Sequence, residues 1–431
     1  MRTASRGAVH QFFLTLGPGI LFAGAAIGGS HLVQSTRAGA DYGFALLWAI
    51  VLVNLFKYPF FEFVQRYTAA AGESFLMGYR RMAKCWLALY LVISLVSGVL
   101  NIAALTVITA GLAGNLIGLD TVFGIELTVF RLSTVIVTVC VVLLLAGHYA
   151  AFDKFVKGLV LTLSISTLIA VVVAATGTQG PAVPTERELL NLAGVTFLLS
   201  LMGWMPAPLD IGAFQSLWTM ERAKETGYRP TVRQTLLDFH VGYLGTAVLA
   251  LAFLALGALV MHPTGQAFAS SGIAFSAQLC ELYAQTLGGW TYYIVAIAAL
   301  SCIFSSTLTC FDGYTRVVHE SVQLLRDLPE ARAAREDWFY WAVMIFWGVC
   351  TLFIAGYLLE NMITLLTVVT VVAFLTAPLL AAMNYLVVRS PFMPERYRPA
   401  PWLHVLAWVG LVFLGGFAAF WLALTLNAWF G

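Results

Sequence analysis

The chain has 431 residues, of which 60% are hydrophobic and only 10% are charged. A soluble domain is about half apolar and about a quarter charged, so this composition excludes an ordinary soluble protein. The formal net charge of +2 is not gathered in a basic tail or patch, and we expect no nucleic-acid partner. The sequence lacks a nucleophile elbow, a phosphate-binding loop and an HExxH motif, so neither an enzymatic activity nor a cofactor is expected. The six cysteines form no CxxC motif and no Cys/His cluster, which predicts free thiols and no structural metal.

Eleven apolar segments follow one another along the chain, each close to the ~20 residues that a helix needs to cross a bilayer. In lipid every backbone polar group must find its partner within the segment, so the sequence predicts an all-α membrane protein. The two longer connections, 263–287 and 313–337, are expected to be partly helical. The predicted spans are 14–38, 43–67, 86–115, 129–148, 155–176, 190–220, 238–261, 288–312, 338–358, 361–388 and 402–428.

The placement of Lys and Arg predicts the orientation of these spans. With the N-terminus in the cytoplasm, 19 of the 23 Lys and Arg residues fall in cytoplasmic segments, three fall on the other side, and Lys57 lies inside the second span. We therefore expect a cytoplasmic N-terminus, and the odd number of spans then places Gly431 outside. The expected location is the bacterial inner membrane, with the lipid bilayer as surroundings and no obligate protein partner evident.

Two of the spans carry residues that interrupt a helix. The first contains the sequence GAAIGGSH at 24–31, and the sixth contains GWMPAPLD at 203–210. Glycine pairs free the backbone from helical geometry, and each proline removes an amide donor. Breaks in the first helix of each five-helix half are typical of secondary transporters that bind substrate at the membrane midplane, although two plain kinks remain the alternative. We expect a first repeat over 1–176, a second over 190–388 and an additional helix within 402–431.

Several motifs of this chain resemble the Nramp family of divalent-metal transporters. The first span opens with Gly-Pro-Gly at 17–19, and the segment 38–48 resembles the family's junction between helices 1 and 2. Met205-Pro206 matches the first half of the helix 6 motif Met-Pro-His-Asn, and 305–309 resembles helix 8. The resemblance covers most of the chain and implies the LeuT-type fold, in which two five-helix repeats are inverted relative to each other.

The family's metal-binding motifs are incomplete in this sequence. The helix 1 motif Asp-Pro-Gly-Asn falls on 28–31, so Gly28 stands in the place of the metal-binding Asp and His31 in the place of the Asn. In helix 6 the metal-binding methionine is kept as Met205, but the following His and Asn are replaced by Ala207 and a proline. The resemblance therefore implies the scaffold of the family with a remodelled site.

Polar groups inside a membrane are costly, which makes each of them a candidate site residue. A neutral imidazole at position 31 could ligate a metal or could bond a freed carbonyl, and the carboxylate at position 210 could bind a cation or cap a helix. The thioether of the retained methionine could bind a metal or fill a gap in the core. The predicted substrate-binding residues are Gly28, Ser30, His31, Met205, Ala207 and Asp210, of which His31, Met205 and Asp210 are the predicted metal ligands. Backbone carbonyls near Met202, Ala25 and Ala26 are further candidate ligands.

A second group of residues is predicted to take part in coupling or gating: Lys57, Ser306, Thr307 and Asp312. An ammonium at the depth of Lys57 needs a partner from another helix, for which we expect Asp210 or Asp312. Asp312 is also four residues before Arg316 and could form a structural ion pair with it. The hydroxyls of Ser306 and Thr307 lie where LeuT-type transporters often bind a coupling sodium ion, but such residues also serve as packing contacts in membranes.

These observations leave three functions open. The first is an Nramp-related secondary transporter that moves a small cation, such as a divalent metal, by alternating access. It would lack the family's usual proton relay, because the third span, 86–116, contains no acidic residue. The second is a transporter of a small organic solute of the amino acid or amine type, favoured by the loss of the helix 1 Asp. The third is a binding or sensing membrane protein that no longer transports.

Overall fold

The computed structural model describes residues 18–117, 128–145, 149–177, 188–265, 268–327, 337–358 and 361–430. Within these ranges the protein is entirely helical. The first half of the described chain consists of α2 (Pro18–Ala26), η1 (Ser30–Ser35), α3 (Thr36–Tyr42), η2 (Gly43–Leu46), α4 (Leu47–Ala71), α5 (Phe75–Met82), α6 (Lys84–Ile117), α7 (Val129–Leu145) and α8 (Tyr149–Thr176).

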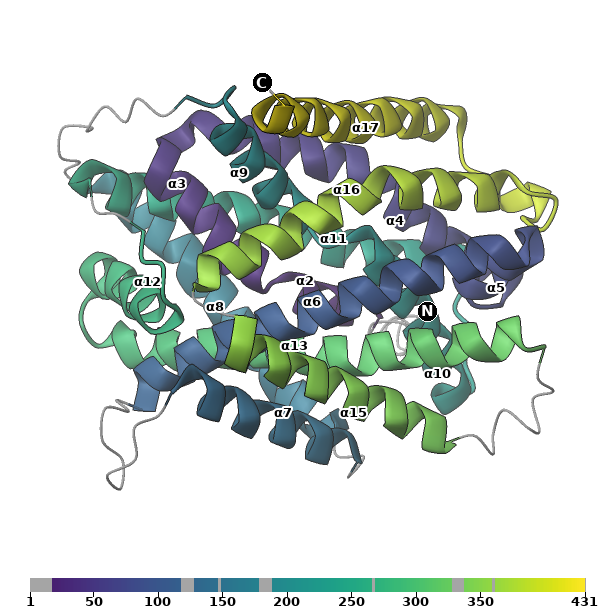
Figure 1. Ribbon diagram of the computed structural model, residues 1–431, viewed down its shortest axis with the longest axis horizontal. Helices are drawn as coiled ribbons and strands as arrows, with labels where there is room; N and C mark the ends of the chain where they lie inside the picture. The colour runs from purple at the N-terminus through teal and green to yellow at the C-terminus, as the bar shows by residue number, and fades with distance from the viewer. Residues whose placement is uncertain are drawn as a thin grey trace, which may run out of the picture.

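The second half repeats the order of a broken helix followed by long helices. It consists of α9 (Leu192–Gly203), η3 (Leu209–Ile211), α10 (Gly212–Thr226), α11 (Val232–Leu256), η4 (Gly257–Met261), η5 (His262–Thr264), α12 (Gly272–Leu287), α13 (Thr291–Leu325), α15 (Asp337–Phe353), η6 (Ile354–Leu358), α16 (Met362–Arg389), η7 (Glu395–Tyr397) and α17 (Pro401–Phe430). Figure 1 shows α6 and α13 crossing the centre of the molecule, where they pack against each other, with α17 at one edge and α7 and α15 at the other.

Each of the eleven predicted spans contains a helix within the described residues, which confirms the all-α membrane architecture. Among the described residues, seven helical segments are long and apolar enough to cross a membrane, and α7, α9 and part of α8 are shorter apolar helices. The seven are Ser30–Ala71, Lys84–Ile117, Val232–Thr264, Thr291–Leu325, Trp338–Tyr357, Met362–Arg389 and Pro401–Phe430.

The peripheral helix α17 shows how these segments are built for lipid. Its buried residues recur every three or four positions on one face, which packs on α4 and α16. Its other face exposes large apolar side chains such as Val405 and Val412, the latter 71% accessible. A helix that is apolar all around suits a bilayer, because hydrocarbon covers the outward face.

Several predicted boundaries differ from the structure by a few residues or more, and α11 and α13 are two helices that are longer than expected. Helix α11 begins at Val232, six residues before the predicted start, because Thr231 and Gln234 form a capping box there. Helix α13 continues to Leu325 instead of ending at residue 312, because this extension keeps a buried face against α5 and α10. The prediction that 263–287 and 313–337 are partly helical is confirmed by α12 and by the end of α13, while 328–336 lie outside the described residues.

Connections that the predicted topology places on one side of the membrane do meet at one end of the molecule. This end carries α5, while α12 lies at the opposite end (Figure 1). Three contacts join the connections at the α5 end: Arg80 Nε to Leu324 O at 3.1 Å, Arg229 Nη2 to Gly72 O at 3.1 Å, and Arg66 Nη1 to Tyr397 O at 3.3 Å.

Both predicted helix breaks are present. Helix α2 ends at Ala26 and the next helical turn begins at Ser30, while α9 ends at Gly203 and η3 begins only at Leu209. The glycine at the end of α9 is required by packing, because a Cβ on Gly203 would collide with the backbone carbonyl of Thr370 on α16. The close approach of α9 and α16 therefore leaves room only for glycine at the end of α9.

Candidate functional site

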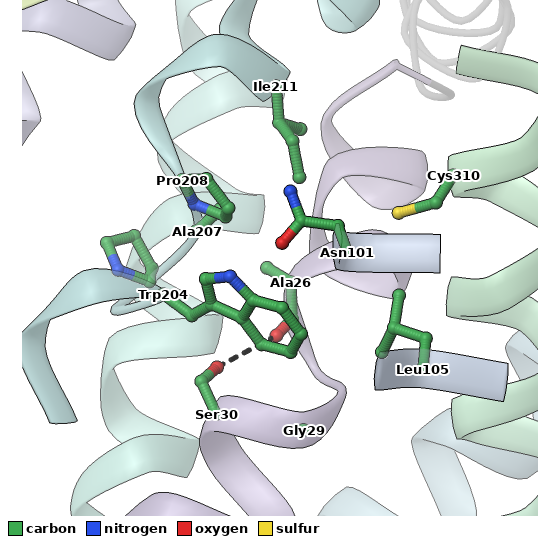
Figure 2. A pocket seen from close by; sticks show the side chains of 11 residues that line it. Ala26, Gly29, Ser30, Asn101, Leu105, Trp204, Ala207, Pro208, Ile211 and Cys310 are labelled. Carbon is green, nitrogen blue, oxygen red and sulfur yellow. Dashed lines mark hydrogen bonds between the residues drawn. The ribbon is translucent and has the colours of Figure 1, made fainter. Parts of the chain in front are cut away.

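A small cavity lies between the two helix breaks and helices α6 and α13 (Figure 2). Its volume is about 20 Å³, which is enough for one water-sized species. The break in helix 1, the break in helix 6, the middle of α6 and one residue of α13 supply its wall. The lining residues are Ala26, Gly29, Ser30, Asn101, Leu105, Trp204, Pro206, Ala207, Pro208, Ile211 and Cys310.

The side chain of Asn101 presents an unpartnered oxygen in this wall. Its Nδ2 donates to the hydroxyl of Tyr314, and that hydroxyl donates its single proton to Asp210 Oδ2 at 2.9 Å. Because the Tyr314 proton is already committed to a carboxylate, the amide must present its N–H to Tyr314. The Oδ1 atom of Asn101 then has no partner among the described residues, although the residue is only 2% exposed.

Trp204 contributes a second unpartnered polar atom. It follows α9 directly within the helix 6 break, and its ring extends toward Asn101, Ala26 and Gly29 in Figure 2. The residue is 5% exposed, and its Nε1–H has no acceptor within the part of the chain that the structure describes. Buried polar groups are almost always hydrogen-bonded, so the unpaired acceptor and the unpaired donor around this cavity are groups that a bound water molecule or a ligand would satisfy.

The backbone freed by the helix 1 break is held by α13. The amide of Gly28 bonds Ala26 O at 2.8 Å, so Gly24 O loses its helical donor. The hydroxyl of Ser306 donates to Gly24 O at 2.8 Å, and the thiol of Cys302 donates to Ile27 O at 2.8 Å. The predicted residue Ser306 therefore lies at the break itself.

The other predicted hydroxyl, Thr307, faces a different neighbour. Its Oγ1 donates to Ile303 O at 2.9 Å and lies 3.0 Å from Thr109 Oγ1 on α6. Gly28 lies beside Ser306, whose Oγ would be 3.1 Å from a Cβ at that position. A side chain at residue 28 would thus press on the hydroxyl that holds the break.

His31 is turned toward α11 and is not part of the cavity wall. Its Nδ1 lies 2.9 Å from Ser30 Oγ, and its Nε2 lies 3.1 Å from the carbonyl oxygen of Thr246. Both ring nitrogens are thus engaged, and the side chain is fully buried. Of the predicted helix 1 residues, the structure places Ser30 on the cavity and His31 behind it.

Lys57 has backbone partners, and within the described residues it forms no direct ion pair with Asp210 or Asp312, although the charge of Asp210 attracts it through space. Its Nζ donates to Met202 O at 2.8 Å, to Gly203 O at 2.7 Å and, at 3.4 Å, to the carbonyl oxygen of Ala207. The carbonyl oxygen of Met202 also accepts the backbone N–H of Met205 at 3.3 Å, and the ammonium adds a donor to all three carbonyls at the end of α9 and in the helix 6 break. The carbonyl near Met202 that was a candidate substrate ligand is therefore already occupied.

The three predicted metal ligands are not brought together around one point. Asp210 lies on η3, accepts from the hydroxyl of Tyr314 and is absent from the cavity lining. Met205 is fully buried next to the cavity but is also absent from its lining. Within the described residues, no three His, Cys, Asp or Glu side chains are grouped so that they could hold a metal ion. Of the predicted site, Ser30 and Ala207 meet at the cavity.

Asp312 joins three helices at the α5 end. The predicted pair with Arg316 is present, with Nε 2.8 Å from both carboxylate oxygens. The hydroxyl of Tyr340 on α15 donates to Oδ1 at 3.0 Å, and Nε1 of Trp218 on α10 lies 3.3 Å from Oδ2. This carboxylate therefore ties α10, the continuation of broken helix 6, to α13 and α15.

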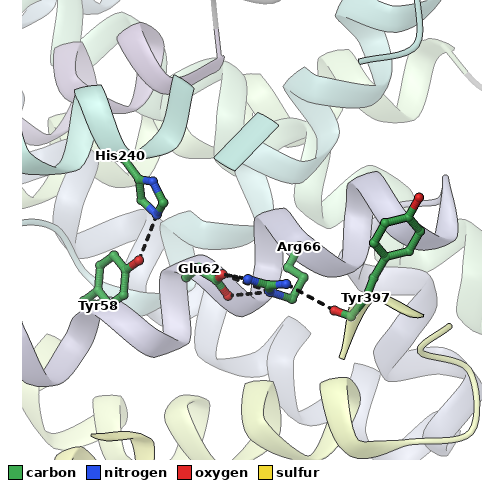
Figure 3. A network of polar contacts seen from close by, with 5 residues as sticks. All are labelled: Tyr58, Glu62, Arg66, His240 and Tyr397. Atoms are coloured by element: carbon green, nitrogen blue, oxygen red, sulfur yellow. Dashed lines mark hydrogen bonds and ion pairs between the residues drawn. The ribbon is translucent and has the colours of Figure 1, made fainter. Parts of the chain in front are cut away.

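A polar network lies on α4 near the same end (Figure 3). Glu62 and Arg66 form a two-point ion pair one helical turn apart, and Tyr58 Oη lies 2.8 Å from His240 Nε2. On the same helix as His240, Asp238 Oδ2 accepts the backbone N–H of Gly19 at 2.6 Å. This last bond fixes the start of α2 to α11.

The sequence interpretation missed Asn101, Trp204 and Cys310. Asn101 is an amide in the middle of a long apolar helix, and intramembrane polarity was a signal that could have identified it. Trp204 lies inside the recognised GWMPAPLD break, but nothing in the sequence shows that its N–H is unpaired. No signal singles out Cys310, whose place on the cavity depends on how α13 packs.

Comparison with known sequences gives one family and a few relatives. The family model described as natural resistance-associated macrophage protein-like, Nramp, matches residues 19–424. An uncharacterized protein of Pasteurella multocida is 36% identical over 418 residues, which cover 96% of this chain and 93% of that protein. The divalent metal cation transporter MntH of Xanthomonas campestris pv. campestris is 25% identical over 300 residues, which cover 68% of this chain and 66% of that protein.

Comparison with solved structures gives the fold. A mutant of the Eremococcus coleocola manganese transporter has a TM-score of 0.68 at 14% identity, covering 95% of this chain and 86% of that one. MhsT in complex with L-phenylalanine has a TM-score of 0.61 at 13% identity, covering 95% and 98%. Mhp1, a nucleobase-cation-symport-1 family transporter, has a TM-score of 0.57 at 15% identity, covering 96% and 92%. These likenesses confirm the expected LeuT-type fold.

Proposed function

The chain belongs to the Nramp family and is an integral membrane protein, and on this premise we propose that it is a secondary transporter of a small cation, with a divalent metal ion as the first substrate to test. In this proposal the first repeat, 1–176, and the second, 190–388, each contribute one broken helix, and the helix within 402–431 is peripheral. The N-terminus lies in the cytoplasm and the C-terminus outside, in a bacterial inner membrane. The proposal rests on the family and on the position of the cavity.

The single observation that carries the proposal is that both helix breaks meet at one buried cavity. Broken helices expose backbone groups at the membrane midplane, where a substrate can use them. The cavity is small enough for one ion or one small polar group and is closed in this conformation, with Ser30 only 1% exposed. Alternating access would open it first to one side of the membrane and then to the other.

In the remodelled site, neutral oxygen atoms take the place of the family's helix 1 carboxylate. Asn101 Oδ1, Ser30 Oγ and nearby backbone carbonyls are hard donors of the kind that Mg²⁺ and Mn²⁺ prefer. The nearest carboxylate in this network, Asp210, acts through Tyr314, whose hydroxyl links it to the Asn101 amide. Binding a cation at Oδ1 would draw electrons along this chain of hydrogen bonds toward the ion.

We propose that transport does not use the family's usual proton route. The third helix, α6, carries no acidic residue anywhere between Lys84 and Ile117. A proton relay along this helix would need such a group. Uptake into proteoliposomes should therefore leave the internal pH unchanged, whereas acidification in proportion to uptake would contradict this part of the proposal.

A second candidate substrate, a small organic solute of the amino acid or amine type, is favoured by the unpartnered Nε1–H of Trp204. A metal ion cannot accept a hydrogen bond, whereas a solute with a carbonyl or carboxylate oxygen can. The absence of any carboxylate among the cavity-lining residues points the same way, because a divalent cation would keep its charge uncompensated there.

A thermal-shift and calorimetry screen on the purified protein tests the proposal. Mn²⁺, Mg²⁺ and Zn²⁺ form one arm, and amino acids and amines form the other. A saturable effect in the metal arm that is lost in Asn101→Ala supports a cation site at the cavity. Asn115→Ala is the matched control, because Asn115 is the same residue type on the same helix, away from the cavity. Binding that is equal in the two variants would remove the cavity as the site.

A further inference from the structure

The ammonium group of Lys57 lies in a cage of three backbone carbonyl oxygens at the helix 6 break. The oxygens belong to Met202 at 2.8 Å, Gly203 at 2.7 Å and Ala207 at 3.4 Å. Lys57 is on α4 and is completely buried, so its charge does not reach solvent. Two of the oxygens come from the last turn of α9, and the third comes from the irregular segment that follows it.

This cage has the chemistry of a cation site. The last carbonyls of a helix have no helical donors, and the helix dipole adds negative partial charge at that end. Rings of such carbonyl oxygens replace the hydration shell of a monovalent cation in K⁺-selective proteins. An ammonium ion and K⁺ are similar in size, and the two short N···O distances leave no room for a water between the ammonium and the oxygens.

The hydrogen bonds of Lys57 all go to these backbone oxygens. No ion pair of Lys57 within 4 Å is present among the described residues, and Asp210, whose carboxylate accepts from Tyr314, attracts the ammonium only through space. A buried lysine is normally paired directly with an acidic side chain. Here the direct ligands of the ammonium are backbone oxygen atoms, as they would be for a bound metal ion.

We propose that the cage formed by Met202, Gly203 and Ala207 is a monovalent-cation site that Lys57 fills permanently with its own ammonium group. The transporter then needs no free cation to hold the helix 6 break, and its function is independent of K⁺. This goes beyond the proposed function, because it concerns a second cation position and not the substrate. Ala207 belongs to both the cage and the proposed substrate site, because its carbonyl oxygen contacts Lys57 and the residue also lines the cavity.

The consequence is that removing the ammonium should create a site for a free cation. In Lys57→Met the apolar stem is kept and only the position of the ammonium is vacated, so the three carbonyls lose the donor that Lys57 supplies. K⁺ or NH₄⁺ can then enter the cage, whereas choline is too large. A ligand that binds only the folded state raises the free energy of unfolding of the protein. Above the Kd, this increase grows with the logarithm of the ligand concentration.

Thermal unfolding of the purified full chain in detergent measures this. In choline chloride we expect Lys57→Met to unfold at a lower temperature than the wild type, and to recover in a saturable way when K⁺ or NH₄⁺ replaces choline. The wild type should show no such response. Lys84→Met is the matched control, because Lys84 is exposed and its ammonium pairs with Asp327, and this variant should show no response to K⁺.

A second variant separates charge from hydrogen bonding. Lys57→Gln keeps N–H donors but carries no charge, and we expect it to respond to K⁺ as Lys57→Met does. Full stability of either variant in choline, without a response to K⁺ or NH₄⁺, would overturn the proposal. Failure of both variants to fold in preparations that contain K⁺ or NH₄⁺ throughout would also count against it, because a free cation should then occupy the cage.

Discussion

The hydroxyl of Tyr314 donates to Asp210 across 2.9 Å, and this bond determines which atom of a third residue faces the cavity. With the proton of Tyr314 committed to the carboxylate, Asn101 must donate to the phenol oxygen and present its carbonyl oxygen to the cavity. One buried network thereby joins α6, α13 and the segment η3 that follows the helix 6 break. A ligand at the cavity is thus connected to a carboxylate that it does not touch.

Tyr314→Phe should weaken both folding and ligand binding. It removes the donor to a buried carboxylate and the acceptor for Asn101, and an unsatisfied buried group of this kind costs about 1–3 kcal/mol. The orientation of the Asn101 amide is then no longer fixed. The comparison is Tyr292→Phe, which removes a hydroxyl bond to Asn115 at 3.1 Å, away from the cavity. Equal melting temperatures and equal ligand affinities in the two variants would show that the network has no special role.

Ser306→Ala should destabilise the helix 1 break. The substitution leaves Gly24 O without its hydroxyl donor in a buried region, at an expected loss of about 1–3 kcal/mol in the free energy of unfolding. The control is Ser166→Ala on α8, whose hydroxyl bonds a carbonyl on its own helix. Thermal unfolding in detergent measures the difference, and a loss no larger than that of the control would contradict the assignment of Ser306 to the break.

Trp204→Phe separates the two substrate classes. The substitution keeps an aromatic ring at the break but removes the unpaired N–H donor. A metal ion makes no use of that donor, so calorimetric affinity for Mn²⁺ should change little. An organic solute that accepts the bond should lose about tenfold in affinity, or about 1.4 kcal/mol. The control for the loss of indole is Trp290→Phe, at a residue that is 71% exposed.

Asp327 gives the connections at the α5 end a dependence on pH. The ammonium of Lys84 and the guanidinium of Arg80 bond this exposed carboxyl and hold its pKa below the ordinary value of 3.8. A lowered folded-state pKa stabilises the protein fully above that ordinary value, and the stabilisation is lost as the pH falls through the folded-state pKa. The effect should be small, because solvent screens exposed pairs.

Acid titration of thermal stability checks this dependence. Asp327→Asn should remove part of the fall in melting temperature between pH 5 and the acid limit, since it cannot be protonated. The melting temperature at neutral pH should fall slightly in the same variant. A titration curve identical to that of the wild type would show that the three side chains do not interact in solution.

The fold could be predicted from the sequence because the patterns that indicate it are local and recur along the chain. The composition excluded a soluble protein, and Gly and Pro in two matching spans predicted both breaks. The signal for orientation is also distributed over many residues, and contacts such as Arg80 with Leu324 place the expected connections at one end. Helix ends were less accurate, because tertiary packing carries α13 well beyond its apolar segment.

The site was predicted less well because its partners are backbone atoms and distant helices. The carbonyl partners of Lys57 exist only because helix 6 breaks in a particular way, and a sequence shows no carbonyl orientation. His31 was expected at the binding point, but rotation of the π-helical turn η1 directs its ring to Thr246. The role of Asn101 depends on Tyr314, which lies more than two hundred residues along the chain.

The central claim is that the cavity between the two breaks opens alternately to the two sides of the membrane. Reaction of Ser30→Cys with a membrane-impermeant thiol reagent tests it most directly, in a chain whose six native cysteines are replaced. Reagent added to either side of oriented proteoliposomes should modify the new thiol, and a bound substrate should slow both reactions. Modification from one side only under every condition, or from neither side, would contradict the claim.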